Sequence, residues 1–284
     1  MTTTMPNRSV NVPNDEPRAR FRDLIATEWI KLWSLRSTPW AFAAIALAII
    51  IFNANAAYAD WSNWPQYSAE TRTGFTPSWA LRDAFTNFAG MSVVLAISAI
   101  GTLTITGEYS TGMIRTTFTA VPARRSVMTA KVAVVSAVTT GFGALVAGTS
   151  FLVTQAILSG RGAGMSITDP GALRAMAGAA LLAPVSGLVG MGLGAVIRHS
   201  ATTIVTSMVL LLLLPVTLSG DHYWTAVIGH AMPYQAWGHL MEGDGAAFNH
   251  YAYPSTVAGA WLVYTVWALA AAVLTVSTVH HRDQ

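Results

Sequence analysis

Cysteine is absent from this chain of 284 residues, and lysine occurs only at Lys31 and Lys131. Without cysteine, the chain can form no disulfide, no iron–sulfur cluster and no thiolate nucleophile. Neither lysine ends a Gly-x-x-x-x-Gly-Lys-Ser/Thr sequence, so the loop with which many ATPases hold nucleotide phosphates is also missing. The sequence therefore predicts no ATPase in this chain and no catalytic, cofactor-binding or metal-binding residues.

Charged residues are also scarce. They make up 10% of the chain, against about 25% in ordinary soluble domains, while 53% of the residues are hydrophobic. Six long stretches without Asp, Glu, Lys or Arg each hold the roughly 20 residues that a helix needs to cross a bilayer. These stretches are continuously apolar, whereas the strands of a membrane β-barrel alternate between apolar and polar residues. The sequence predicts an all-α integral membrane protein with six transmembrane helices near residues 39–58, 86–106, 132–158, 175–197, 200–218 and 255–279.

The basic residues indicate the orientation of these helices. If both termini are cytoplasmic, twelve Lys and Arg residues lie inside and four lie outside, the bias expected from the positive-inside rule. The inner ones are Arg8, Arg18, Arg20, Arg22, Lys31, Arg36, Arg115, Arg124, Arg125, Lys131, Arg198 and Arg282. The basic pI of about 9.4 then follows from the topology, and no nucleic-acid partner is predicted. Residues 1–19 are polar and predict a disordered cytoplasmic tail before a membrane domain over 20–284.

Residues 20–38 match neither the polar tail nor a transmembrane span. At 100° per residue, one arc of a helix collects the apolar side chains Phe21, Leu24, Ile25, Trp29, Leu32 and Leu35. This pattern predicts an amphipathic helix in the cytoplasmic membrane interface. Its interfacial residues would be Glu28, Trp29, Lys31, Trp33 and Arg36.

Glu28 interrupts the apolar arc of this predicted helix. One interpretation is a pair with Lys31 three residues on, or a carboxylate that reaches sideways to water. The other is that this face also meets protein and that Glu28 meets a basic group there, with Arg124 or Arg125 as candidates. The sequence leaves both interpretations open.

The segment 107–131, "GEYSTGMIRTTFTAVPARRSVMTAK", is polar and lies between the second and third spans. A short helix is expected over 110–119, and Pro122 should end it before the next helix begins. One interpretation is an ordinary cytoplasmic loop whose arginines extend to lipid phosphates. The other is a rigid element that a partner protein moves.

Two stretches of this chain resemble ABC-transporter permeases of the type-2 export family, in particular those of high-GC Gram-positive bacteria. The first is Glu108-x-x-x-Gly112 followed by Pro122, Arg124-Arg125 and Lys131. The second is "TEWIKLWSLRSTPW" at 27–40. Met113 departs from the family pattern, in which a threonine often follows the glycine.

This resemblance implies a permease in a bacterial plasma membrane that acts as a dimer, with a homodimer expected. Each permease would bind one of two cytoplasmic ATPase subunits, and these would hold ATP and Mg²⁺. The resemblance implies an elbow helix at 20–38 and a coupling helix within 107–120. Glu108, Gly112 and Arg115 would shape or contact the docking surface, and Arg124, Arg125 and Lys131 would anchor the third span at the inner leaflet. Pro122 belongs to the same set of coupling residues. The cargo would be an unidentified, amphipathic, drug-like or lipid-like substrate.

Other interpretations concern transport without an ATPase and the exterior loop at 219–254. An ATPase-independent carrier or channel is one alternative, although the predicted spans lack the mid-membrane ionisable residues of a proton or ion relay. A membrane sensor or enzyme that uses the loop histidines His222, His230, His239 and His250 is another. Their spacing does not match that of zinc ligands. Two short helices are expected at 223–232 and 233–241.

Small residues recur in the fourth predicted span at Gly187, Gly190 and Gly194. Gly190-x-Gly192-x-x-Ala195 formally matches a relaxed dinucleotide motif, but it lies inside an apolar span without a preceding strand. Small residues at this spacing let helices approach closely in lipid. The sequence therefore predicts helix packing here.

Overall fold

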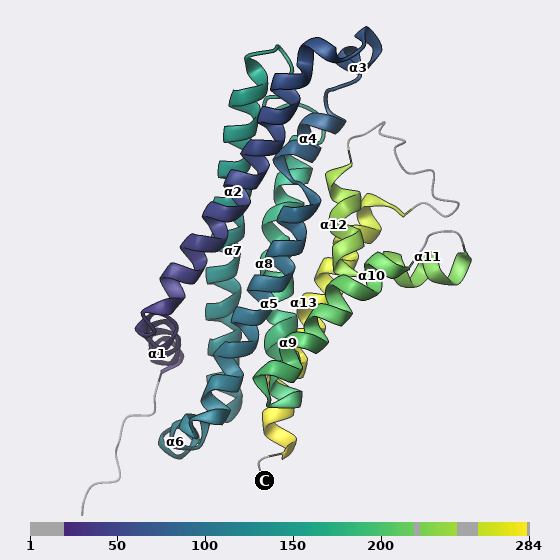
Figure 1. Ribbon diagram of the computed structural model, residues 1–284. Helices are drawn as coiled ribbons and strands as arrows, with labels where there is room; N and C mark the ends of the chain where they lie inside the picture. Colours follow the sequence, from purple (N-terminus) through teal and green to yellow (C-terminus); the bar gives the residue numbers. More distant parts are fainter. Residues whose placement is uncertain (1–19, 219–221, 243–254, 283–284) are drawn as a thin grey trace, which may run out of the picture.

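The computed structural model describes residues 20–218, 222–242 and 255–282, and every regular element in this part is helical (Figure 1). The predicted tail at 1–19 lies outside the described residues. The elements in chain order are α1 Phe21–Ser34, α2 Ser37–Asn63, η1 Trp64–Gln66, α3 Ala69–Thr73, α4 Ser78–Ala84, α5 Asn87–Ser110, α6 Met113–Ala120, α7 Arg124–Ser159, α8 Ala172–Ile197, α9 Ser200–Met208, the π-helical turn η2 Val209–Leu213, α10 Leu214–Thr217, α11 Tyr223–His230, α12 Pro233–Met241 and α13 Val257–Arg282.

Within the described residues, six helical segments are long and apolar enough to cross a membrane. They are Ser37–Gln66, Ser78–Ser110, Arg124–Ser159, Ala172–Ile197, Ser200–Thr217 and Val257–Thr278. Each contains most or all of one span predicted from the gaps between charged residues. The prediction of an all-helical, six-span architecture is confirmed, and these helices indicate a multi-pass membrane protein.

Helix α8 forms the centre of the bundle and contacts α5, α7, α12 and α13. Glycine makes the approach to α5 possible. A Cβ atom on Gly101 would lie 2.0 Å from the carbonyl oxygen of Gly187, and one on Gly190 would lie 2.0 Å from that of Ser98. The prediction that the glycines of the fourth span serve helix packing is confirmed.

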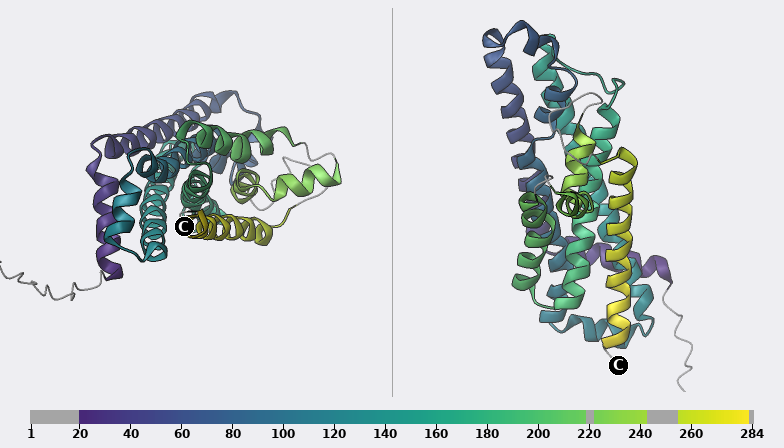
Figure 2. Two further views of the ribbon diagram at one scale, coloured as in Figure 1. Left: turned by 90° about the horizontal axis from the view of Figure 1, so that it is seen from below. Right: turned by 90° about the vertical axis from the view of Figure 1, so that its right-hand side faces the viewer.

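Helix α1 lies across the long axis of the bundle, as the right-hand view of Figure 2 shows. Its Leu24 side chain packs against Val127 and Ala130 of α7. The chain turns at Leu35 and Arg36, before Pro39, which lies in the first turn of α2. Proline fits there because the first turn of a helix leaves its N–H groups without intrahelical partners.

Helix α6 connects the second and third spans at one end of the bundle, called here the α6 end (Figure 1). The short helix expected in this segment is confirmed, but it begins at Met113, because α5 continues through Ser110. Between the two helices Gly112 adopts a left-handed conformation with φ of 72°. Glycine reaches this conformation without steric cost, so the chain can turn from α5 into α6 within two residues. Pro122 then separates α6 from α7, as predicted.

The fifth span contains the π-helical turn at Val209–Leu213, directly before Pro215. Proline has no N–H to donate to the carbonyl four residues earlier, and its ring crowds that carbonyl. A wider turn relieves this conflict, and a single turn within an α-helix is the form in which π-helix mostly occurs. The short helices α11 and α12 then follow, as the sequence predicted, and both lie further from the α6 end than α9 does (Figure 1).

Candidate functional site

Four charged side chains from three helices meet at the α6 end of the bundle. Glu28 comes from α1, Glu108 from the last turns of α5 and Lys131 from α7, and these three residues are 4%, 5% and 3% exposed. Lys31 of α1 completes the group with a side chain that is 21% exposed. We call these four residues the charge cluster. It contains two carboxylates and two amines, so its formal charges cancel.

Each amine of the charge cluster contacts both carboxylates. The Nζ atom of Lys131 donates to Glu28 Oε2 and, at 2.9 Å, to Glu108 Oε1. The Nζ atom of Lys31 lies 2.8 Å from Glu28 Oε1 and 3.1 Å from Glu108 Oε1. Burial favours the neutral amine of Lys31, but the hydrogen bond to Glu28 and the charge of Glu108 outweigh this and raise its pKa above the ordinary value.

The charge cluster decides between the interpretations of Glu28. The pair with Lys31 three residues on is confirmed. The second basic partner is Lys131, so the proposed pairing with Arg124 or Arg125 was wrong. These arginines begin α7, whereas Lys131 lies almost two turns further along, at the level of Glu28.

The cluster contains two of the residues predicted to take part in coupling. Glu108 was expected to shape or contact a docking surface, and Lys131 to anchor the third span at the inner leaflet. Both are buried between helices, and each carboxylate needs an amine partner once it leaves water. Glu108 precedes α6 in the chain and Lys131 follows it. The segments on both sides of α6 are therefore held in the same charge cluster, which also links them to α1 through Glu28 and Lys31.

Helix α6 is anchored by its apolar face. Ile114 is buried, and Phe118 packs beside the contact of Leu24 with Val127. The guanidinium of Arg124 lies 5.4 Å from the centre of the Phe118 ring. The exposed face carries Arg115, so α6 presents a cation to the surroundings.

A hollow of about 850 Å³ lies beside α6, between the end of α5 and the start of α7. We call it the α6 hollow. Three arginines line it, Arg115, Arg124 and Arg198, together with Tyr109 and Phe118, and none of the lining residues in the described part of the chain is acidic. Arg198 follows α8 and holds its guanidinium 4.6 Å from the centre of the Tyr109 ring. The α6 hollow is therefore a basic surface with aromatic walls.

The remaining predicted residues lie around these two features. Arg125, Pro122 and Arg36 are exposed, and Gly112 lines the α6 hollow. Trp29 and Trp33 lie 5.8 Å apart between ring centres on the exposed side of α1. The sequence did not single out Arg198 or Tyr109 for this site, because nothing in the chain shows that the end of α8 lies beside the end of α5.

The histidines of the 219–254 segment do not form a metal centre in the described part of the chain. No three His, Cys, Asp or Glu side chains gather there in a way that could hold a metal ion. His239 Nδ1 lies 3.5 Å from Glu242 Oε2, on the same helical turn. His250, the fourth member of the predicted group, lies outside the described residues.

Comparison with protein-family models and with curated proteins found no match to this chain.

Proposed function

We propose that this chain is the membrane-spanning subunit of an ATP-driven exporter of the ABC type, and that α6 is its coupling helix. In this proposal the α6 end faces the cytoplasm, where a separate ATPase binds the α6 hollow. The chain holds no ATP itself, since both lysines belong to the charge cluster and neither ends a phosphate-binding loop.

The observation that carries this proposal is the attachment of α6. Its flanking residues Glu108 and Lys131 enter one charge cluster with Glu28 of α1. A force applied to α6 would therefore reach α1, α5 and α7 together, because separating any one of them exposes an unpaired buried charge. A solvated loop between two spans would transmit no such force.

Helix α1 would lie in the cytoplasmic membrane interface. It crosses the bundle axis (Figure 2), and its exposed tryptophans Trp29 and Trp33 are side chains that favour the headgroup region. Two such chains, each with its own ATPase, would form the working exporter in a bacterial plasma membrane. The dimer and the direction of transport are proposed from the family resemblance.

Substitution of Arg115 by glutamate tests this docking surface directly. Arg115 is exposed and lies outside the charge cluster, so charge reversal there should leave the fold intact. We expect about tenfold weaker binding of the partner ATPase, since a reversed charge at an interface opposes an acidic partner surface. Binding is measured between the permease in lipid nanodiscs and purified ABC-type ATPase subunits from the same genome.

The control for this experiment is Arg36→Glu, which reverses an exposed charge outside the α6 hollow. It should leave the affinity unchanged. Equal effects of the two variants would contradict docking at the hollow. Transport by the purified permease in proteoliposomes without ATP or a partner would instead favour an ATPase-independent carrier or channel.

A further inference from the structure

Helix α2 carries exposed aromatic side chains near both of its ends. Trp40 is exposed near the start of the helix, and Tyr58 is exposed near its far end, which lies opposite α6 in the bundle (Figure 1). Tyr58 stacks on Trp61, with 5.8 Å between ring centres. From Trp40 to Trp61 the helix rises by about 32 Å, close to the thickness of about 30 Å of a hydrocarbon core. Tryptophan and tyrosine favour the two headgroup layers, so Tyr58 and Trp61 are expected in the headgroup layer remote from α6.

The side chain of Arg161 lies on this aromatic pair. Arg161 follows the end of α7, where its Nε donates to the carbonyl oxygen of Trp61 over 3.1 Å and its guanidinium lies 4.4 Å from the centre of the Trp61 ring. Gly160 makes room for the indole, since a Cβ there would lie 3.0 Å from Trp61 Nε1. The hydrogen bond and the cation–π contact together fix the position of the guanidinium.

The guanidinium keeps donors for a further group. Arginine has five N–H donors, and the bond to Trp61 uses the one on Nε. In the part of the chain that the structure describes, no carboxylate pairs with Arg161. Asp60, which precedes Trp61, accepts a hydrogen bond from Tyr67 at 2.8 Å, and Asp169 accepts one from the backbone N–H of Ser166 at 2.8 Å. The four N–H groups on the two Nη atoms can therefore meet an external anion.

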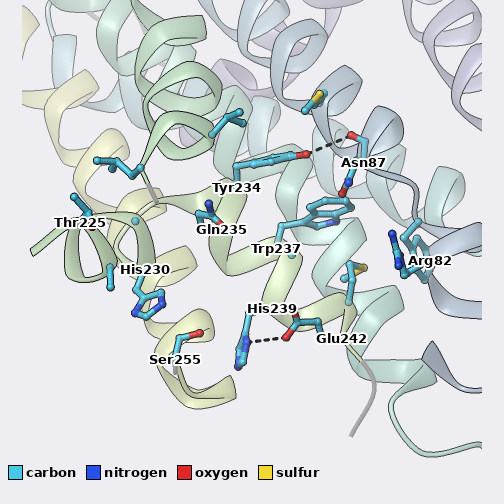
Figure 3. Close-up of a pocket in the computed structure, with 18 of the residues that line it drawn as sticks. Arg82, Asn87, Thr225, His230, Tyr234, Gln235, Trp237, His239, Glu242 and Ser255 are labelled. Atoms are coloured by element: carbon cyan, nitrogen blue, oxygen red, sulfur yellow. Dashed lines mark hydrogen bonds and ion pairs between the residues drawn. The ribbon is translucent and has the colours of Figure 1, made fainter. Parts of the chain in front are cut away.

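A second arginine–tryptophan contact differs in this respect. The guanidinium of Arg82 lies 5.0 Å from the centre of the Trp79 ring, beside a cavity of about 540 Å³ that Figure 3 shows. Arg82 has a further interaction besides this one. Arg161 is therefore the better candidate of the two for binding an external anion.

The exposed face of α7 leads to the same place. Leu145 and Leu152 are exposed, and Ser159 is exposed seven residues further on. Residues seven apart lie on the same face of a helix, so apolar surface runs along α7 to the neighbourhood of Arg161. An acyl chain can lie on this surface while its headgroup lies beside the guanidinium.

We infer that Arg161, held on Trp61, binds the phosphate of a phospholipid in the leaflet remote from α6. A guanidinium pairs with two phosphate oxygens at once, and phospholipids supply phosphate at the depth where Tyr58 and Trp61 are expected. The inference depends on the membrane-spanning fold and not on coupling at α6. It is measured without ATP or a partner chain, so it can fail while the proposed function stands, and the reverse.

The absence of cysteine allows a fluorescent label at this site alone. Ser159→Cys is labelled with bimane in the delipidated chain in mild detergent, and phosphatidylcholine with a nitroxide quencher on its headgroup is added. We expect saturable quenching. Arg161→Gln should need about tenfold more lipid for half of the quenching, because a charge-assisted contact is lost. Arg161→Lys keeps the charge without the planar fork, so its affinity should lie between the two.

Two controls separate this site from general binding of lipid. Arg72→Gln removes an exposed arginine of α3 that donates to the carbonyl oxygen of Pro65, and it should bind lipid like the unchanged chain. Gly141→Cys moves the label to an exposed position on α7 where a Cβ meets no atom within 4 Å. Quenching of that label should be the same with Arg161 and with Arg161→Gln.

Competition identifies the group that is bound. Dioleoylphosphatidylglycerol should displace the nitroxide lipid, whereas dioleoylglycerol, which has the same acyl chains and no phosphate, should not do so at the same concentration. Equal displacement by both lipids, or unchanged quenching in Arg161→Gln, would overturn the inference. Displacement by inorganic phosphate or by a soluble acidic peptide at the concentration of the lipid would also overturn it, because the site would then take a free anion or a protein.

Discussion

Substitution of Lys131 by methionine should lower the free energy of unfolding by about 3–5 kcal/mol, the cost of leaving buried charges without a partner. Lys131 is 3% exposed and contacts Glu28 and Glu108. Methionine fills a similar volume, so the loss arises from the missing charge. Thermal unfolding in lipid nanodiscs, followed by tryptophan fluorescence, measures the change in Tm.

Two further variants separate this electrostatic effect from a general loss of packing. In Glu108→Gln combined with Lys131→Met, one carboxylate faces one amine again, since Lys31 still pairs with Glu28. The double variant should therefore be more stable than Lys131→Met alone. Arg125→Met removes an exposed charge from the same helix and should change stability by less than about 0.5 kcal/mol. A double variant no more stable than the single one would contradict the charge cluster.

Substitution of Gly101 by alanine should destabilise the bundle by about 3 kcal/mol or more and strongly reduce the yield of folded protein. The new methyl group would lie 2.0 Å from the carbonyl oxygen of Gly187. Because this neighbour is backbone, no rotamer change can remove the overlap, and α5 and α8 must move apart. The measurement is thermal unfolding, together with the recovered amount of monodisperse protein.

Gly107→Ala is the matched control, because Gly107 lies on the same helix and a Cβ there meets no atom within 4 Å. Alanine is the better helix former by up to about 1 kcal/mol, so this variant should be as stable as the unchanged chain or slightly more so. A similar loss of stability in both variants would show that the close contact of α5 with α8 is not the cause.

The sequence predicted those features that depend on local chemistry. Gaps between charged residues located all six spans, because a charge inside hydrocarbon is costly wherever it lies in the chain. Pro122 marked the end of α6 for an equally local reason, whereas its start at Met113, after Gly112, was not predicted. The glycines of α8 indicated close packing, although the sequence did not say that Gly101 and Ser98 of α5 would be the opposing residues.

The candidate site was predictable only in part, because its residues meet through tertiary structure. The position of Glu28 on an apolar arc indicated a buried carboxylate and the need for a partner. Glu28 pairs with Lys131 rather than with Arg124 because of the position at which α1 packs along α7. The sequence of neither helix encodes that position. Arg198 joins the α6 hollow for a similar reason, since it comes from the end of the central helix.

Helix α5 begins at Asn87 and lines the α6 hollow with Tyr109 near its other end. Between them, Gly101 and Ser98 fix it against α8, and Glu108 ties it to two other helices. Binding equilibria joined by such a rigid element are thermodynamically linked, and linkage is reciprocal. If a ligand at one end of α5 changes the affinity for a ligand at the other end by some factor, the second ligand must change the affinity for the first by the same factor. The coupling can thus be measured by titrating either ligand in the presence of the other.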